Sequence, residues 1–170
     1  QTADRAIGAA ILEMGESISR DPENARLYAQ QAGVYYFGGY YLFGDERFLQ
    51  RAAARMETAI ELAPNLLAYR HQLASLYLDA GRAEEAAGVL RDATAVYDGW
   101  DLTHRLRAQA ELTVGDTVAA GRALYHMARL GDGWSEGERR AVGGLIVPAV
   151  VRRGQPALAD SLRRMLDEGP

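Results

Sequence analysis

Residues 67–98 constrain the fold more strongly than any other part of this chain. In the first half of the stretch, large apolar side chains recur at helical spacing around the small Ala74, at Leu73, Leu76 and Tyr77. Gly81 follows them, and glycine commonly ends a helix because it adopts the left-handed conformation without steric cost. This pattern predicts an amphipathic helix that stops at Gly81.

A second helix is predicted directly after Gly81. Glu84 and Glu85 stand at its start, where the positive end of the helix dipole favours carboxylates, and Arg91 stands nearer its other end. Its apolar edge consists of Ala86, Leu90 and Ala93. Because both helices are short and adjacent, we expect them to fold back on each other as a hairpin.

These residues resemble a tetratricopeptide repeat (TPR), a helical hairpin with a period of about 34 residues. Ala74 and Ala86 stand at the family's small eighth and twentieth positions, and Tyr77, Leu90 and Ala93 stand at its eleventh, twenty-fourth and twenty-seventh. Small residues are needed there because helices that cross at about 8–10 Å leave no room for large side chains. The resemblance implies an all-α fold.

The rest of the chain fits further units of this kind, so the resemblance implies one TPR-like domain over residues 1–170. The expected units are an orphan or capping helix at 3–20, a long repeat at 24–64, the best-matching repeat at 65–98, a degenerate repeat at 99–132 and a terminal repeat at 135–168. The implied fold class is a right-handed α-solenoid of TPR-like helical hairpins with about nine helices.

The long repeat exceeds the best-matching one by seven residues. Its expected turn residue, Gly44, lies eleven residues after Gly33, against seven between Ala74 and Gly81. We therefore expect one added turn in each helix, which keeps the same face buried, with Asp45 as the N-cap of the second helix. The expected buried positions are Ala32, Gly33, Tyr36, Ala52, Met56 and Ala59.

The degenerate repeat departs from the pattern in its first helix. Arg107 and Glu111 occupy its seventh and eleventh positions, although Ala108 keeps the eighth position small. Its second helix matches well, because Gly115 and Ala120 follow Gly81 and Ala86 at the repeat period. The rotation of the first helix therefore stays open at this stage.

The terminal repeat carries clear end signals. Ser135 and Glu138 form a capping-box pattern, and Gly154 is the expected turn. Pro148 lies inside the first helix, where the missing amide hydrogen predicts a kink.

No pattern of a catalytic or metal site is present. His71, His104 and His126 lie far apart without a second ligand at metal spacing, and we expect them at the surface or in a groove. Gly38 with Gly39, and Gly143 with Gly144, lie inside helical patterns, so close packing explains them better than a phosphate loop. We expect a protein that is not an enzyme, with no cofactor and no metal.

Composition and charge narrow the partners. The net charge is −4 with both signs interspersed, which argues against nucleic acid as a partner. The last fifty residues do hold eight arginines against six acids, including the pairs Arg139–Arg140, Arg152–Arg153 and Arg163–Arg164, which we interpret as solvated helix ends. All basic residues are arginine, which indicates the coding bias of a GC-rich, bacterial genome.

The compartment stays open. Residues 27–44 carry no charge, but their glutamine, tyrosine and glycine content argues against a transmembrane span. The absence of cysteine excludes disulfides without fixing the location. Because the chain begins with Gln1, we expect either a trimmed chain or a cleaved precursor, cytoplasmic or, after signal-peptide removal, periplasmic or exported.

In TPR proteins the first helices of successive repeats line a concave groove, so the resemblance implies a groove here. The chaperone-adaptor clamp of Lys and Asn is absent, since Gln30, Val34, His71 and Ser75 stand at its positions. Arg105 is the one expected cationic contact. The candidate partner-binding residues are Leu27, Gln30, Val34, Phe37, Tyr41, His71, Ser75, Arg105 and Gln109.

Residues 35–44 are unusually aromatic, with six aromatic side chains in ten positions. Helical spacing places Tyr36, Tyr40 and Phe43 on one face toward neighbouring helices, and Phe37 and Tyr41 on another, toward the groove. Two interpretations remain: a packed lid over the lengthened hairpin, or a contact surface for a partner.

Three functions are compatible with this sequence. The favoured one is a non-catalytic module that binds a peptide or partner subunit in its concave groove. The alternatives are a structural subunit of a stable assembly, in possible association with a membrane complex, and an auxiliary domain of a larger enzyme.

Overall fold

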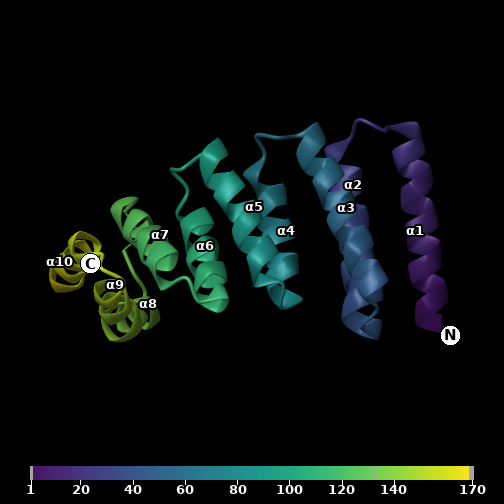
Figure 1. Cartoon of the computed structure of the whole chain (residues 1–170). Coiled ribbons are helices and arrows are strands. Elements are labelled where there is room, and N and C mark those ends of the chain that lie inside the picture. The colour runs from purple at the N-terminus through teal and green to yellow at the C-terminus, as the bar shows by residue number, and fades with distance from the viewer. Residues whose placement is uncertain (1, 132, 169–170) are drawn as a thin grey trace. The chain divides into compact units, whose positions relative to one another are not determined.

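The structure is a computed structural model that describes residues 2–131 and 133–168. Gln1, where the expected domain begins, and Asp132, where the expected degenerate repeat ends, lie outside the described residues. The described part consists of helices and turns without a strand, and its helical segments form nine continuous helices, as predicted (Figure 1). The chain divides into two compact units, residues 1–76 and 77–170.

The first unit begins with α1 (Thr2–Arg20), which packs against α2 (Ala25–Gly33) and η1 (Val34–Tyr41). The Gln31 side chain donates a hydrogen bond to the Ile11 carbonyl at 3.3 Å, which ties α2 to α1. α3 (Glu46–Leu62) returns alongside α2 and η1, and α4 (Leu67–Asp79) follows, with its last turn from Tyr77 on counted in the second unit. Asp45 caps α3 as predicted, because its carboxylate accepts a hydrogen bond from the Arg47 amide at 3.0 Å.

The lengthened first helix of this unit is not a plain α-helix. Residues Val34–Tyr41 form η1, a π-helical segment that continues α2. A π-turn closes over one more residue than an α-turn, so the added residues are taken up partly by widening the helix. Ala32 is fully buried as expected, whereas Gly33 faces open space, since a Cβ there would meet nothing within 4 Å. The prediction that Gly33 is a packing residue was wrong.

Close packing does explain the next two glycines. A Cβ on Gly39 would lie 2.0 Å from the Phe48 ring, and one on Gly38 would lie 3.0 Å from Ile7 of α1. The corresponding interpretation fails for Gly144, where a Cβ would meet nothing within 4 Å. Gly38 and Gly39 therefore let η1 approach α1 and α3 closely.

The second unit contains α5 (Ala83–Val96), α6 (Asp101–Val114), α7 (Thr117–Arg129), α8 (Glu136–Ala141), η2 (Val142–Ile146), α9 (Val147–Arg152) and α10 (Pro156–Glu168). The expected turn residues Gly81, Gly115 and Gly154 all have positive φ, as does Gly44 in the first unit. Behind Gly115, the Asp116 amide donates to the Glu111 carbonyl at 2.8 Å, the closing bond of a Schellman turn.

The core of the second unit contains a residue that the repeat pattern did not identify. Trp134 is buried and donates an indole N–H hydrogen bond to the Leu124 carbonyl at 2.9 Å. Its neighbours in this cluster are Ala108, Ala123, Leu124, Met127, Val142, Ile146, Val147, Val150, Ala159 and Leu162. Trp134 is therefore tied to α7 by this hydrogen bond.

The degenerate repeat keeps the expected pattern of buried positions, with a carboxylate in place of an apolar side chain. Glu111 is buried, and its carboxylate lies 3.0 Å from Nη1 of Arg91 on α5 and 3.7 Å from Nε of Arg107. Ala108, at the small position, is buried as expected. Two arginines thus compensate the charge that the sequence places in this core.

The Pro148 helix is interrupted in an unexpected way. η2 precedes α9, and its closing bond runs from the Val147 amide to the Val142 carbonyl, five residues back. A wider turn relieves the contact between the proline ring and the preceding carbonyls, so the helix continues as α9. The bend predicted at Pro148 stays a prediction, and the terminal capping box of Ser135 and Glu138 is present as expected.

Candidate functional site

The candidate site begins with one exposed face of α2 and η1. Gln30, Phe37 and Tyr41 are exposed on it, and Leu27 and Val34 are partly exposed. All five predicted first-helix residues of this unit therefore reach solvent. We call this surface the α2–η1 face.

Two aromatic side chains dominate the α2–η1 face. Phe37 is 65% exposed and Tyr41 is 72% exposed, and their rings lie 6.5 Å apart in an edge-on arrangement. The Phe37 ring also meets the edge of the buried Tyr36 ring at 5.1 Å, which supports it from below. The pair is therefore anchored to the hairpin while leaving most of its area uncovered.

The aromatic side chains predicted to face neighbouring helices differ in part from that prediction. Tyr35 and Tyr36 are both buried, and Tyr35 packs near Phe48 of α3 at a ring distance of 6.2 Å. Phe43, which helical spacing placed toward neighbouring helices, is 51% exposed. The π-helical turn changes the angle between successive residues, so a count based on α-helical spacing misplaces the residues that follow it.

His71 and Ser75 on α4 contribute less surface than expected. Ser75 is partly buried, and His71 is buried at 6% exposure. Burial lowers the pKa of His71 below its usual value of 6.5, so the imidazole is held uncharged at neutral pH. His104 is also buried, and its Nε2 donates to the Asp98 carbonyl at 2.8 Å. The expectation of surface histidines was wrong for these two residues.

Arg105 and Gln109 lie on α6 in the second unit. Gln109 is exposed, whereas Arg105 forms an ion pair with Glu138 of α8. Glu138 also accepts hydrogen bonds from the Ser135 amide at 2.7 Å and the Ser135 hydroxyl at 2.6 Å. A partner's carboxylate at Arg105 would therefore compete with Glu138.

We expect the contact between Arg105 and Glu138 to weaken at acidic pH. Burial alone would raise the pKa of Glu138, but hydrogen bonds from Ser135 and the charge of Arg105 outweigh it and hold the pKa below its ordinary value of 4.5. Because the folded-state pKa is lowered, the stabilisation is complete above about pH 4.5 and is lost as pH falls through the folded value.

Glu138→Gln should therefore flatten the dependence of unfolding free energy on pH below about 4.5, measured by urea denaturation at a series of pH values. Glu136→Gln, at an exposed neighbour on the same helix, is the matched control. A Glu138→Gln profile that stays parallel to wild type in this range would contradict the assignment.

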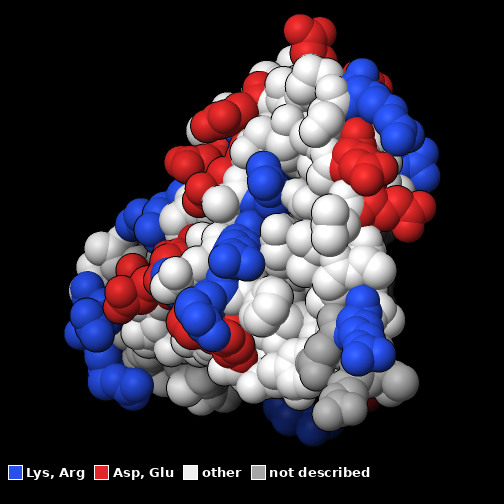
Figure 2. Space-filling model, turned by 90° about the vertical axis from the view of Figure 1, so that its right-hand side faces the viewer, with Lys and Arg blue, Asp and Glu red and all other residues white. Residues whose placement is uncertain are grey.

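The face of the molecule in Figure 2 carries no single large patch of positive or negative charge. Acidic and basic side chains alternate over it with uncharged surface between them, in keeping with the net charge of −4. Within residues 2–131 and 133–168, no three histidine or acidic side chains gather as a metal-binding group. No helix in that part of the chain combines the length and apolar character that crossing a bilayer requires.

Solved structures share this arrangement of helices at low sequence identity. A crystal structure of MamA matches with a TM-score of 0.63 and 16% identity, covering 95% of this chain and 87% of that one. YrrB, described as a TPR protein with an unusual peptide-binding site, matches with 0.57 and 17%, covering 91% and 73%. TTC0263, a thermophilic TPR protein of Thermus thermophilus, matches with 0.53 and 18%, covering 96% and 84%. The chain has the TPR fold.

The all-α, solenoid class of TPR hairpins predicted from the sequence is thereby confirmed. No protein-family model and no curated protein sequence matches the chain. The structure therefore reveals the similarity to TPR proteins, whereas the sequence shows the TPR pattern clearly in only one repeat.

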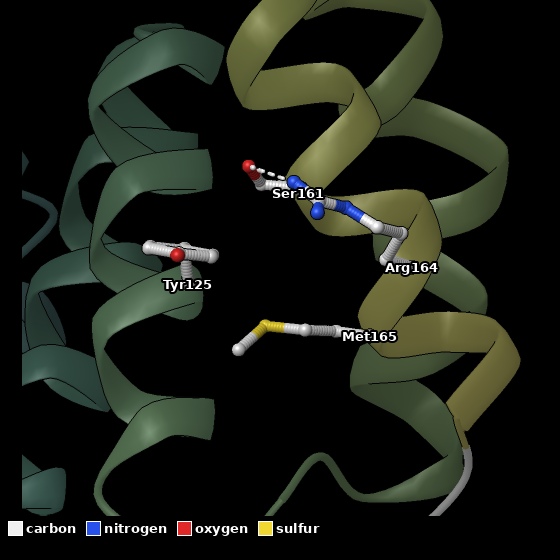
Figure 3. A pocket seen from close by; sticks show the side chains of 4 residues that line it. All are labelled: Tyr125, Ser161, Arg164 and Met165. Atoms are coloured by element: carbon white, nitrogen blue, oxygen red, sulfur yellow. Dashed lines mark hydrogen bonds between the residues drawn. The ribbon is translucent and has the colours of Figure 1, made fainter.

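A cleft lies outside the TPR groove positions. It opens between α7 and α10, the second helices of the last two repeats, with a volume of about 180 Å³. Its walls are formed by Tyr125 on one side and by Ser161, Arg164 and Met165 on the other (Figure 3). No sequence pattern predicts this cleft, although the arginine excess of the last fifty residues is a partial signal.

Proposed function

We propose that this chain is a non-catalytic TPR module that binds a peptide or a segment of a partner protein on the α2–η1 face. The observation that carries the proposal is the exposed pair Phe37 and Tyr41. Large exposed apolar side chains that gather on one surface mark contact sites, because water contact with such area is unfavourable. The fold class supports the same function, since YrrB is described as having a peptide-binding site.

The α2–η1 face suits a mixed apolar and polar segment. Phe37 and Tyr41 offer ring area, and the Tyr41 hydroxyl adds a polar tip at low cost in side-chain entropy. Gln30, exposed on the same face, carries an amide that can both donate and accept a hydrogen bond with a peptide backbone. Leu27 and Val34 add partly exposed apolar area to the same face.

The experiment uses the whole chain, immobilised, to capture partners from an extract of the native source, followed by affinity measurement with the recovered partner. Phe37→Ala and Tyr41→Ala are each expected to weaken binding by about tenfold, since exposed aromatic anchors contribute about 1–2 kcal/mol or more at interfaces.

Leu12→Ala is the matched control, because Leu12 is 69% exposed on α1 of the same unit. It should leave the affinity unchanged. If the Phe37→Ala/Tyr41→Ala double variant retains every partner at wild-type affinity, the α2–η1 face is not the binding surface.

A further inference from the structure

The cleft between α7 and α10 has a mixed lining. The Tyr125 ring and the Met165 thioether face each other across it, and the Ser161 and Arg164 side chains lie together above Met165 (Figure 3). Its volume of about 180 Å³ is below the range of about 300–1,000 Å³ that small-molecule and cofactor sites occupy. The cleft is therefore too small for a nucleotide or a cofactor and is of a size for amino-acid side chains.

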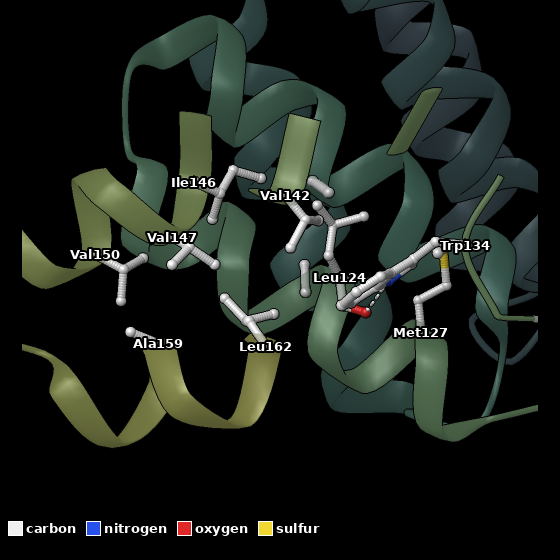
Figure 4. Packing of buried hydrophobic residues seen from close by; sticks show 11 residues of the cluster. Leu124, Met127, Trp134, Val142, Ile146, Val147, Val150, Ala159 and Leu162 are labelled. Carbon is white, nitrogen blue, oxygen red and sulfur yellow. Dashed lines mark hydrogen bonds between the residues drawn. The ribbon is translucent and has the colours of Figure 1, made fainter. Parts of the chain in front are cut away.

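The packing beneath the cleft explains why it stays open. Gly121 brings α7 close to its neighbours, since a Cβ there would lie 3.0 Å from Ile146 and 3.5 Å from Leu162. Leu162 is fully buried in the core below, next to Ala159 and Val150 (Figure 4). One helical turn further along each helix stand Tyr125 and Met165, whose larger side chains line the cleft.

Arg164 lines the cleft, and two further arginines stand near Tyr125 on α7. Arg164 has one hydrogen bond among the described residues, from Nη2 to the Ser161 hydroxyl at the long distance of 3.5 Å. Arg129 lies over the Tyr125 ring at 5.8 Å, and Arg122 stands on the same side of α7, one turn before Tyr125. Among the side chains that the structure describes, which do not include those of Asp132 and Glu168, none of these three arginines forms an ion pair, whereas Arg163 is paired with Asp160 at 3.0 Å.

The Tyr125 hydroxyl completes the set of donors, because the Ser161 hydroxyl already donates its hydrogen within its own helix. The Ser161 hydroxyl donates to the Ala157 carbonyl at 2.9 Å and keeps its lone pairs toward Arg164. The Tyr125 hydroxyl makes no hydrogen bond within residues 2–131 and 133–168, and the guanidinium of Arg164 has spare N–H groups. Guanidinium and phenol donors together match a carboxylate, which accepts at two oxygens.

We propose that this cleft binds an acidic side chain of a protein partner, with the carboxylate at Arg164 and Tyr125 and an adjacent apolar residue against Met165. The Tyr125 ring and the Met165 thioether supply apolar surface next to the cations, so an acidic residue beside an apolar one fits better than a lone anion. The site lies on second helices, so it is separate from the α2–η1 face and does not depend on its function.

Methionine methyl NMR on the whole chain tests this directly. The chain has four methionines, of which Met165 lines the cleft, Met56 and Met127 are buried in the cores and Met14 is in the other unit. The probe is a blocked pentapeptide of alternating glutamate and leucine, and the same peptide with glutamine is its control. The glutamate peptide should shift the Met165 methyl signal saturably and leave Met14 and Met56 unmoved.

Variants separate the cleft from general charge. Arg164→Gln should weaken the peptide's effect about tenfold, and Tyr125→Phe about threefold, because they remove a charged and a neutral donor respectively. Arg163→Gln, next in sequence but already paired with Asp160, should change it less than about twofold. The Phe37→Ala/Tyr41→Ala double variant should leave it unchanged.

Several results would overturn the proposal. They are an equal response to the glutamine peptide, an Arg163→Gln effect as large as that of Arg164→Gln, and no Met165 shift at millimolar peptide. A Met165 shift with inorganic phosphate but not with the glutamate peptide would also overturn it, in favour of a small-anion site.

Discussion

Gly39→Ala is expected to destabilise the first unit by about 3 kcal/mol, at the upper end of the range for overpacked cores. The added Cβ would lie 2.0 Å from Cγ and 2.6 Å from Cβ of Phe48, so the clash involves the base of the side chain as well as its ring. Rotating the ring away cannot relieve a contact with Cβ, so η1 and α3 must separate. The loss should appear as a lower urea midpoint, followed by far-ultraviolet circular dichroism.

Gly33→Ala is the matched control on the same continuous helix. A Cβ there meets nothing within 4 Å, and alanine is favoured over glycine in a helix by about 0.5–1 kcal/mol. This variant should therefore be as stable as wild type or slightly more stable. If Gly39→Ala unfolds at the wild-type midpoint, the close approach of η1 to α3 does not exist in solution.

Removing both arginines around Glu111 should also cost about 3 kcal/mol or more. In Arg91→Met/Arg107→Met the buried carboxylate loses both cationic partners, and removing the partners of a buried charged group typically costs about 3–5 kcal/mol. The same urea unfolding experiment measures it. The single variants should each cost less, because one arginine remains within reach.

The variant Glu111→Leu is the comparison that tests whether the two arginines are needed because of the Glu111 carboxylate. It leaves no buried charge, and Arg91, whose side chain is 53% exposed, can turn to water. An apolar residue at this position also restores what the best-matching repeat has at Tyr77. We expect Glu111→Leu to be less destabilising than the double arginine variant, and the reverse order would show that the carboxylate is not held mainly by these two cations.

The elements that depend on local chemistry could be predicted from the sequence. Gly81 and Gly154 end helices with positive φ, and Ser135 with Glu138 forms its capping box, because these signals act within a few residues. The buried positions of the best-matching repeat also follow from helical periodicity alone, as Leu73 and Leu90 show.

Other features depend on contacts that a single sequence does not reveal. Counting residues against an α-helical period cannot anticipate the π-helical segment Val34–Tyr41, so Phe43 was placed on the wrong side of the helix. Arg105 was expected to be a cationic contact, and its ion pair with Glu138 joins residues 33 positions apart. Trp134 was missed because it belongs to a loop rather than to a repeat position.

The candidate site was predicted in part. The first-helix spacing found the exposed side chains of the α2–η1 face, because residues three and four apart share one side of a helix. It did not identify the cleft between α7 and α10, since the lining residues Tyr125 and Arg164 come from two helices far apart in sequence. A surface built by one helix can thus be found from its periodicity, whereas a cleft between two helices requires their packing.

Photo-crosslinking tests the central claim, that the α2–η1 face receives the partner, most directly. A benzophenone amino acid replaces Tyr41 in the whole chain and, in a second sample, replaces Leu12, both of which are exposed in the same unit. With the captured partner present, irradiation should yield a covalent adduct from position 41 and little or none from position 12. An adduct from position 12 but not from position 41, or equal yields from both, would contradict the account.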